Sequence, residues 1–307
     1  MSMQIFSDET IGYKKSFFIY SAIYGKKENL NKLSQKIDSI AKANKNILGN
    51  GFIEFKANKL NYHNINSLGL VYEEFFKAFN ELFATNNCGC IISFYSKKKY
   101  DDNMGFLKKL IEKKLDSGEF NKFFPGISKS DYPAIYNRID HLMLYYKYRD
   151  RFLKDKEKID FYPDSSGKIL RYKGTRIKIN SKETLLIDTP FFNGIRILGN
   201  SICHWLQTAH LFGYPDQVNT INHYEPLDSK KSRLIQICDA ISNFTFSSIN
   251  YLKGQKSGSS EKKFYLLSKY LDCEEQLKSA SKNFNLDNIG NLSCINDELK
   301  ANIIISL

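Results

Sequence analysis

The sequence predicts an α/β fold. Short apolar and aromatic runs of strand length alternate with longer segments whose apolar residues recur every three or four positions. The composition agrees, because 42% of the 307 residues are hydrophobic, which is enough for a sizeable core. No repeat and no sharp linker interrupts the pattern, so one elaborated domain fits the chain better than two.

The predicted strands are short apolar runs that end in turn residues. Residues 3–6 and 16–24 form the first two, and Gly12 lies in the turn between them, so we expect a hairpin. The same pattern predicts further strands at residues 88–96, 158–167 and 223–232. The stretches 169–179 and 184–192 also read as strands or a hairpin, in the part of the chain that is hardest to interpret.

The predicted helices have one apolar face. In residues 27–46 such a face lies opposite a charged one. Further helices are predicted at residues 71–85, 103–115, 132–154, 201–212 and 233–252. We therefore expect a domain over residues 1–252 with an insertion at about 168–222. The extension 253–307 begins with a flexible stretch, 253–263, and continues as a helical segment packed on that domain.

The charge balance favours a polyanionic partner. Lys and Arg number 45 against 33 Asp and Glu, a net charge of +12, and nucleic acid is the first choice of partner. The alternative is that the lysine excess reflects AT-rich coding and a solvated surface. No apolar stretch approaches the roughly 20 residues that span a bilayer, and no signal peptide is recognisable, so we expect a cytoplasmic protein without membrane contact.

The six cysteines do not follow a metal or disulfide pattern. Only Cys88 and Cys90 are close together, and no CxxC pair or Cys/His spacing follows them. Free and mostly buried thiols are therefore expected. No glycine-rich phosphate loop, GxSxG motif or dinucleotide fingerprint occurs either, which weakens the NTPase, serine hydrolase and dehydrogenase interpretations.

Several acidic residues lie where a chain would otherwise place apolar ones. Asp8 and Glu9 end the first strand, Glu54 lies between Ile53 and Phe55, Asp164 ends a later strand, and Asp239 interrupts an apolar helix. A buried carboxylate is costly unless it is paired, hydrogen-bonded or bound to a cation. Taken singly, each acid could cap a turn or helix, be solvated or be a bonded core residue, and Asp239 is the strongest anomaly.

Taken together, the acids indicate a divalent metal site. Mg²⁺ and Mn²⁺ prefer hard oxygen ligands, and two such ions can promote phosphodiester cleavage. We therefore expect Asp8, Glu54, Asp164 and Asp239 to be catalytic metal ligands. Adjacent residues of a strand point to opposite faces, so Asp8 is preferred over Glu9 as a direct ligand.

Four segments resemble a bacterial family known as domain of unknown function 3800, whose fold is similar to that of RNase H. They are FSDETIGYKKSFFIYSAIYG, FIEFKANKL, IDFYPDSSG and PLDSKKSRLIQICDAISNF, in the same order along the chain over residues 3–250. Thr10 stands where the family has Ser, Cys238 where it has a small Ala, and the turn after the first motif is short. Residues 168–222 and the tail beyond 253 fall outside the resemblance.

The resemblance implies a mixed five-stranded sheet of the RNase H type, with Asp8, Glu54, Asp164 and Asp239 converging at one edge. Thr10 would then support the site, and Glu9 would either join it or point to the other face of the sheet. Lys56 is either a phosphate contact or an ion-pair partner of an acid, and Gln236 lies one helical turn from Asp239. Ser229 and Lys230 could meet substrate, although this turn could equally cap the following helix.

These features predict a metal-dependent nuclease that acts on RNA or DNA and serves phage defence or a mobile element. The alternative is a nucleic-acid- or partner-binding module on the same fold, with structural acids. A phosphoester hydrolase acting on small nucleotides is a third interpretation. A homo-oligomer or a protein partner is compatible with each of them.

Overall fold

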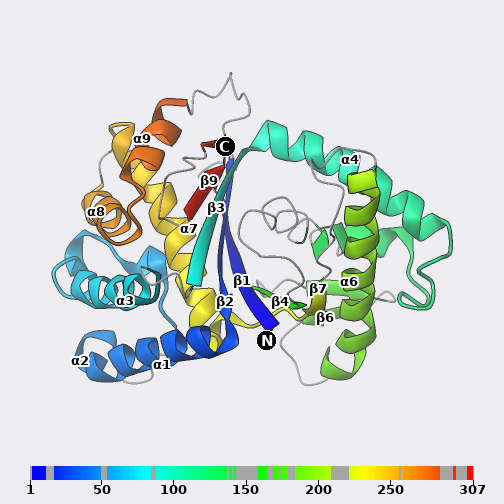
Figure 1. Cartoon of the computed structure of the whole chain (residues 1–307), viewed down its shortest axis with the longest axis horizontal. Helices are drawn as coiled ribbons and strands as arrows, with labels where there is room; N and C mark the ends of the chain where they lie inside the picture. Colours follow the sequence, from blue (N-terminus) through cyan, green and yellow to red (C-terminus); the bar gives the residue numbers. More distant parts are fainter. Residues whose placement is uncertain are drawn as a thin grey trace. The chain divides into compact units, whose positions relative to one another are not determined.

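A computed structural model of the chain provides the structure (Figure 1). It describes residues 2–11, 17–49, 54–83, 88–133, 135–136, 138–139, 142, 158–164, 169–172, 175–178, 184–208, 221–255, 257–283, 293–294 and 303–306. The chain divides into two compact units. Unit 1 comprises Met1–Met3 and Tyr100–Asp228, and unit 2 comprises Gln4–Lys99 and Ser229–Leu307.

The described part of unit 2 is built on a mixed five-stranded sheet. Its strand order is β1-β2-β3-β9-β8. The strands are β1 (Ser2–Ile11), β2 (Phe17–Lys26), β3 (Cys88–Ser96), β8 (Ser293–Cys294) and β9 (Ile303–Ser306). β3 runs antiparallel to β2 and parallel to β9, which makes the sheet mixed. The α/β prediction is therefore confirmed for this unit.

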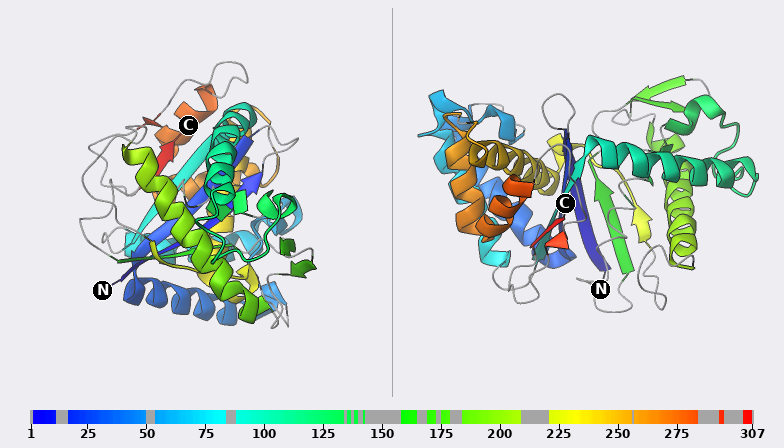
Figure 2. Two further views of the ribbon diagram at one scale, coloured as in Figure 1. Left: turned by 90° about the vertical axis from the view of Figure 1, so that its right-hand side faces the viewer. Right: turned by 90° about the horizontal axis from the view of Figure 1, so that it is seen from above.

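Helices cover one side of β2 and β3 in unit 2 (Figure 2). They are α1 (Lys27–Ala43), α2 (Lys45–Leu48), α3 (Leu68–Phe83), α7 (Arg233–Leu252), α8 (Ser260–Leu271) and α9 (Glu274–Asn283). α7 lies against β2, where Ser21 Oγ donates a hydrogen bond of 2.5 Å to the carbonyl of Cys238. α8 and α9 pack on α7, so the tail contributes to the core of the unit.

Aromatic side chains fill the space between α3 and α7. Phe76 stacks on Phe244 with ring centroids 5.3 Å apart, and Tyr72 lies 5.3 Å from the same ring. Phe75 and Phe79 are also fully buried. On α3 these residues recur at positions 72, 75, 76 and 79, which is the spacing of one helical face.

The described part of unit 1 contains two strand pairs with helices. β4 (Lys158–Pro163) runs parallel to β7 (Ile221–Tyr224), and β5 (Ile169–Tyr172) pairs antiparallel with β6 (Thr175–Lys178). Its helices include α4 (Lys97–Asp116) and α6 (Thr184–Thr208), and α6 packs against β7. The hairpin expected near residue 170 is thus present. None of the described helices is long and apolar enough to cross a membrane.

Three local predictions were wrong. Residues 184–192 belong to α6 and not to a strand, because the buried Phe191, Ile195 and Leu198 share one helical face. The helix expected over 27–46 ends at Ala43, and α2 follows after Asn44. The stretch 253–263 is helical from Ser260, since Ser260 and Lys263 are buried against the unit. Of the helix expected over 132–154, the part beyond residue 142 lies outside the described residues.

Candidate acidic site

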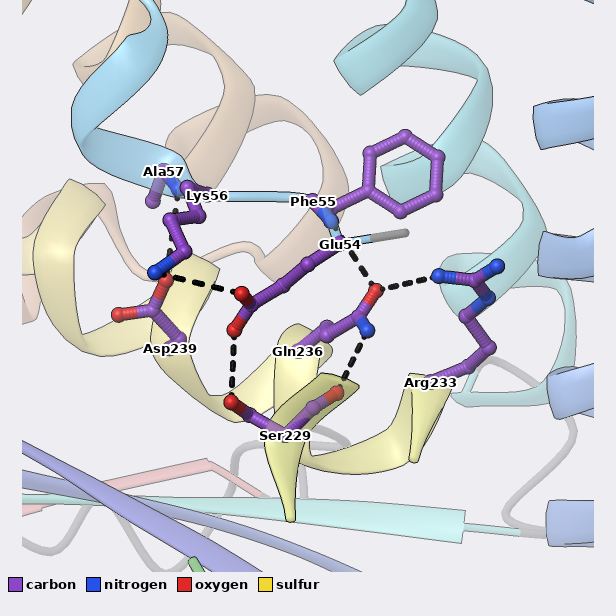
Figure 3. A network of polar contacts seen from close by, with 8 residues as sticks. All are labelled: Glu54, Phe55, Lys56, Ala57, Ser229, Arg233, Gln236 and Asp239. Atoms are coloured by element: carbon purple, nitrogen blue, oxygen red, sulfur yellow. Dashed lines mark hydrogen bonds and ion pairs between the residues drawn. The ribbon is translucent and has the colours of Figure 1, made fainter. Parts of the chain in front are cut away.

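The candidate site lies in unit 2, where residues 54–57 run along one side of α7 (Figure 3). The backbone N–H of Phe55 donates to Gln236 Oε1 at 3.1 Å, and the N–H of Ala57 donates to Asp239 Oδ2 at 3.4 Å. Gln236 and Asp239 are three residues apart on α7, so they share one helical face. Two side chains of α7 thus accept hydrogen bonds from the backbone of residues 54–57 and hold this segment against the helix.

Gln236 joins this segment to the turn that precedes α7. Its side chain is 1% exposed, and its Nε2 donates to the carbonyl of Ser229 at 2.6 Å. Arg233 Nη1 donates to Gln236 Oε1 at 2.9 Å, while Arg233 Nε donates to Asp38 Oδ1 at 2.7 Å. Both ends of the buried amide are thus satisfied, which fixes its orientation.

Glu54 is held by the same turn. Ser229 Oγ donates to Glu54 Oε1 at 2.6 Å, and the Glu54 side chain is 12% exposed. A short hydroxyl–carboxylate hydrogen bond of this kind is charge-assisted and fixes the position of the acid. Ser229 begins the 3-10 turn η6 (Ser229–Lys231), so the residue serves the site and not the cap of α7, which Ser232 provides.

The pKa of Asp239 is raised because this carboxyl is poorly solvated and lies close to Glu54. Burial raises the pKa of Asp239, the negative charge of Glu54 raises it further, and the Ala57 N–H, Lys56 and Lys263 oppose these effects. Burial, followed by the charges of Asp239 and Glu54, raises the pKa of Tyr72. Residues 54 and 239 are far apart in the chain, yet they form one acid pair beside the Tyr72 ring.

Two lysines balance the acid pair. Lys56 Nζ lies 3.3 Å from Glu54 Oε2, and the Lys56 side chain is 47% exposed. Lys263 on α8 is 5% exposed, donates to Asn243 Oδ1 at 3.2 Å and has its Nζ 5.4 Å from the centre of the Phe244 ring. Burial lowers the pKa of Lys263 to about 8, although Asp239 acts in the opposite direction.

Five of the predicted site residues are therefore brought together: Glu54, Lys56, Ser229, Gln236 and Asp239. Asp8 is buried on β1. This strand contacts α7, where Cys238 Sγ donates a hydrogen bond of 3.2 Å to the carbonyl of Phe6. Lys230 is exposed on η6.

The remaining predicted site residues are not assigned to this cluster. Asp164 belongs to unit 1, is half-buried and forms an isolated parallel bridge with Leu227. Glu9 and Thr10 lie on β1, and their side chains fall outside what the structure describes.

Sequence reasoning missed four members of the site: Tyr72, Arg233, Asn243 and Lys263. Arg233 and Asn243 could have been found, because they lie three residues before Gln236 and four after Asp239 on the same helix. Tyr72 and Lys263 carry no such signal, since only tertiary packing brings α3 and α8 to the acid pair.

The acid pair fits part of a divalent cation site. Mg²⁺ is commonly held by one or two carboxylates, with water and substrate phosphates completing its shell. Glu54 and Asp239 supply two such carboxylates, both partly withdrawn from water. In the part of the chain that the structure describes, no group of three or more His, Cys, Asp or Glu side chains is placed to hold a metal ion.

The thiol prediction is confirmed for the five cysteines whose burial is described. Cys88, Cys90, Cys203, Cys238 and Cys273 are buried thiols that form no disulfide. Burial raises the pKa of the Cys88 thiol to about 12, so this thiol is neutral and inert at physiological pH.

Comparison with models of protein families finds no match. Comparisons with curated proteins and with solved structures likewise find no significantly similar protein.

Proposed function

We propose that this chain is a divalent-metal-dependent nuclease of RNase H-like fold, with Glu54 and Asp239 as the anchor of its metal site. The observation that carries the proposal is this acid pair, assembled from distant segments in a poorly solvated place where its charge is unfavourable. Asp8, which is buried on β1, is the further proposed ligand.

The RNase H-like part of the proposal is supported by the order of elements. In that fold, three consecutive strands are followed by strands that helical crossovers connect. Here β1, β2 and β3 are neighbours in the sheet of unit 2, and the parallel pair β4 and β7 follows in unit 1, with α6 between them in the chain. The resemblance of the four sequence segments points in the same direction.

The residues around the acid pair have distinct roles in this proposal. Ser229 fixes Glu54, the Ala57 N–H fixes Asp239, and Gln236 holds the backbone between the two acids. Mg²⁺ or Mn²⁺ bound by the pair would stabilise the charge that develops on the phosphoryl oxygens during cleavage. The net charge of +12 favours association with the nucleic-acid backbone.

Cleavage assays test the proposal. Purified protein is incubated with RNA, DNA and hybrid substrates in Mg²⁺ or Mn²⁺, alongside Glu54→Gln and Asp239→Asn. The Glu81→Gln variant is the control, because Glu81 is an exposed acid that pairs with Lys36 away from the cluster. Loss of at least about a hundredfold in rate is expected for the two site variants only. Absence of cleavage by the wild type, or equal cleavage by all variants, would contradict the proposal.

One observation favours the second candidate, a nucleic-acid- or partner-binding module with structural acids. Lys56 and Lys263 already balance the two carboxylates within the described residues. That function predicts salt-dependent binding without a metal requirement. It also predicts that Asp239→Asn harms stability, which the nuclease proposal does not.

A further inference from the structure

The two lysines at the acid pair are held very differently. Lys263 is 5% exposed, and both Asn243 and the Phe244 ring fix its ammonium. Lys56 is 47% exposed, and within the described residues its ammonium makes one ion pair, with Glu54. One positive charge is therefore built into the core, whereas the other reaches the site from solvent on a flexible side chain.

The ion pair between Lys56 and Glu54 costs little free energy to break. Ion pairs that involve a half-exposed lysine change an equilibrium by no more than about fivefold, because water and salt screen the attraction. The acid pair nevertheless needs positive charge, since Asp239 is desolvated and close to a second carboxylate. Lys56 thus supplies a required charge through a weak contact.

We propose that Lys56 is an exchangeable counter-ion whose ammonium stands beside Glu54 and Asp239 in place of a divalent cation and moves into solvent when that cation binds. This inference rests on the proposed function, because it presupposes that the pair takes a metal. Lys263 stays in place, since its own contacts hold it within the core.

The exchange has a consequence for substrate binding. With both acids ionised and both lysines charged, the formal charge of Glu54, Asp239, Lys56 and Lys263 is zero. Replacement of the Lys56 ammonium by a divalent ion leaves this group with a formal charge of +1. The exchange therefore adds one positive charge to the site, which favours binding of a phosphodiester with its one negative charge, so substrate affinity is coupled to the exchange.

Calorimetric titration with Mn²⁺ in the absence of nucleic acid tests this exchange. Lys56→Gln removes the competing ammonium, and the affinity for Mn²⁺ is expected to rise about two- to fivefold. Lys36→Gln is the matched control, because Lys36 has a side chain that is 48% exposed and pairs with Glu81 elsewhere in unit 2. Its affinity should equal that of the wild type. Asp239→Asn in the Lys56→Gln background should abolish binding, which assigns the ion to this site.

Each result bears on the two proposals separately. If the wild type binds Mn²⁺ through Asp239 and Lys56→Gln binds equally or less well, the exchange is refuted and the nuclease proposal stands. If neither protein binds Mn²⁺, both are refuted. If Lys56→Gln weakens only the binding of nucleic acid, Lys56 is a phosphate contact and the exchange is again refuted. Thermal unfolding in EDTA verifies that each variant is folded.

Discussion

Gly89 lies directly against the ring of Tyr24 on the neighbouring strand. The two residues are paired across β2 and β3, and a Cβ atom on Gly89 would overlap Cζ of Tyr24. Real Cβ atoms do not approach other atoms so closely. The tyrosine is 7% exposed, so its ring occupies the space that a side chain at position 89 would need.

Gly89→Ala should therefore destabilise the protein by about 1–3 kcal/mol, because the buried ring must move in a packed core. Urea unfolding measures the change. Gly105→Ala on the exposed side of α4 is the control, since its Cβ would meet nothing within 4 Å, and helix propensity should make it neutral or stabilising. Equal stability of the wild type and Gly89→Ala would show that Tyr24 leaves this position readily.

Asp239→Asn should stabilise the metal-free protein at neutral pH. Burial and Glu54 raise the pKa of Asp239, so the ionised form is disfavoured in the folded state, while an amide keeps an acceptor for the Ala57 N–H. The gain should be present above the pKa of Asp239 in the folded state and disappear below the ordinary aspartate value of 3.8. Thermal unfolding in EDTA from pH 3 to pH 8 measures it. A destabilised variant at neutral pH would favour the structural role of the acid.

Glu73 should stabilise the contact between α3 and α8 in a pH-dependent way. It accepts hydrogen bonds from Lys262 at 2.6 Å, Tyr270 at 3.1 Å and Lys269 at 3.2 Å, and the bond from Lys262 is the main cause of its lowered pKa. This stabilisation is present above the ordinary value of 4.5 and is lost as the pH falls through the lower pKa of the folded state.

Glu73→Gln should accordingly cost about 1 kcal/mol at pH 7, and the difference from the wild type should shrink below about pH 4. Chemical denaturation at the two pH values measures both effects. Because Glu81 makes a more exposed ion pair, Glu81→Gln should change stability less. A difference between Glu73→Gln and the wild type that is independent of pH would refute the ionic origin of this contact.

Gln236→Leu should destabilise unit 2 by about 2–4 kcal/mol. The substitution leaves the Phe55 N–H and the Ser229 carbonyl without their partner in a place that is 1% exposed, and each lost partner costs about 1–3 kcal/mol. Urea denaturation quantifies the loss, and Gln35→Leu on the exposed face of α1 serves as the control. A cost below about 0.5 kcal/mol would mean that residues 54–57 do not depend on this amide.

The sequence was sufficient to predict the bounds of those helices and strands whose apolar residues follow a clear pattern. β3 and α7 have the predicted bounds, because an apolar run between turn residues and an apolar face along a whole helix are local signals. Residues 184–192 were misread since nine residues rich in apolar side chains fit either period. The helical face becomes evident only when α6 is followed as far as Thr208.

The part of the site that could be predicted from the sequence is the acid that lies among apolar residues. Asp239 stands out among Ile235, Ile237, Ala240 and Ile241, and the structure places it with Glu54. The compensating side chains were not predictable. Lys263 lies in a stretch that looks solvated in the sequence, and only the packing of α8 on α7 buries it.

The dependence of the acid pair on Lys263 links the site to the last part of the chain. During synthesis, residues 54–57 and α7 emerge before α8, so a nascent chain holds two carboxylates without their buried counter-charge. The negative charge of the two carboxylates is balanced by Lys263 only when α8 packs on α7. A chain truncated after α7 would therefore contain both acids but lack the buried ammonium of Lys263 that offsets their repulsion.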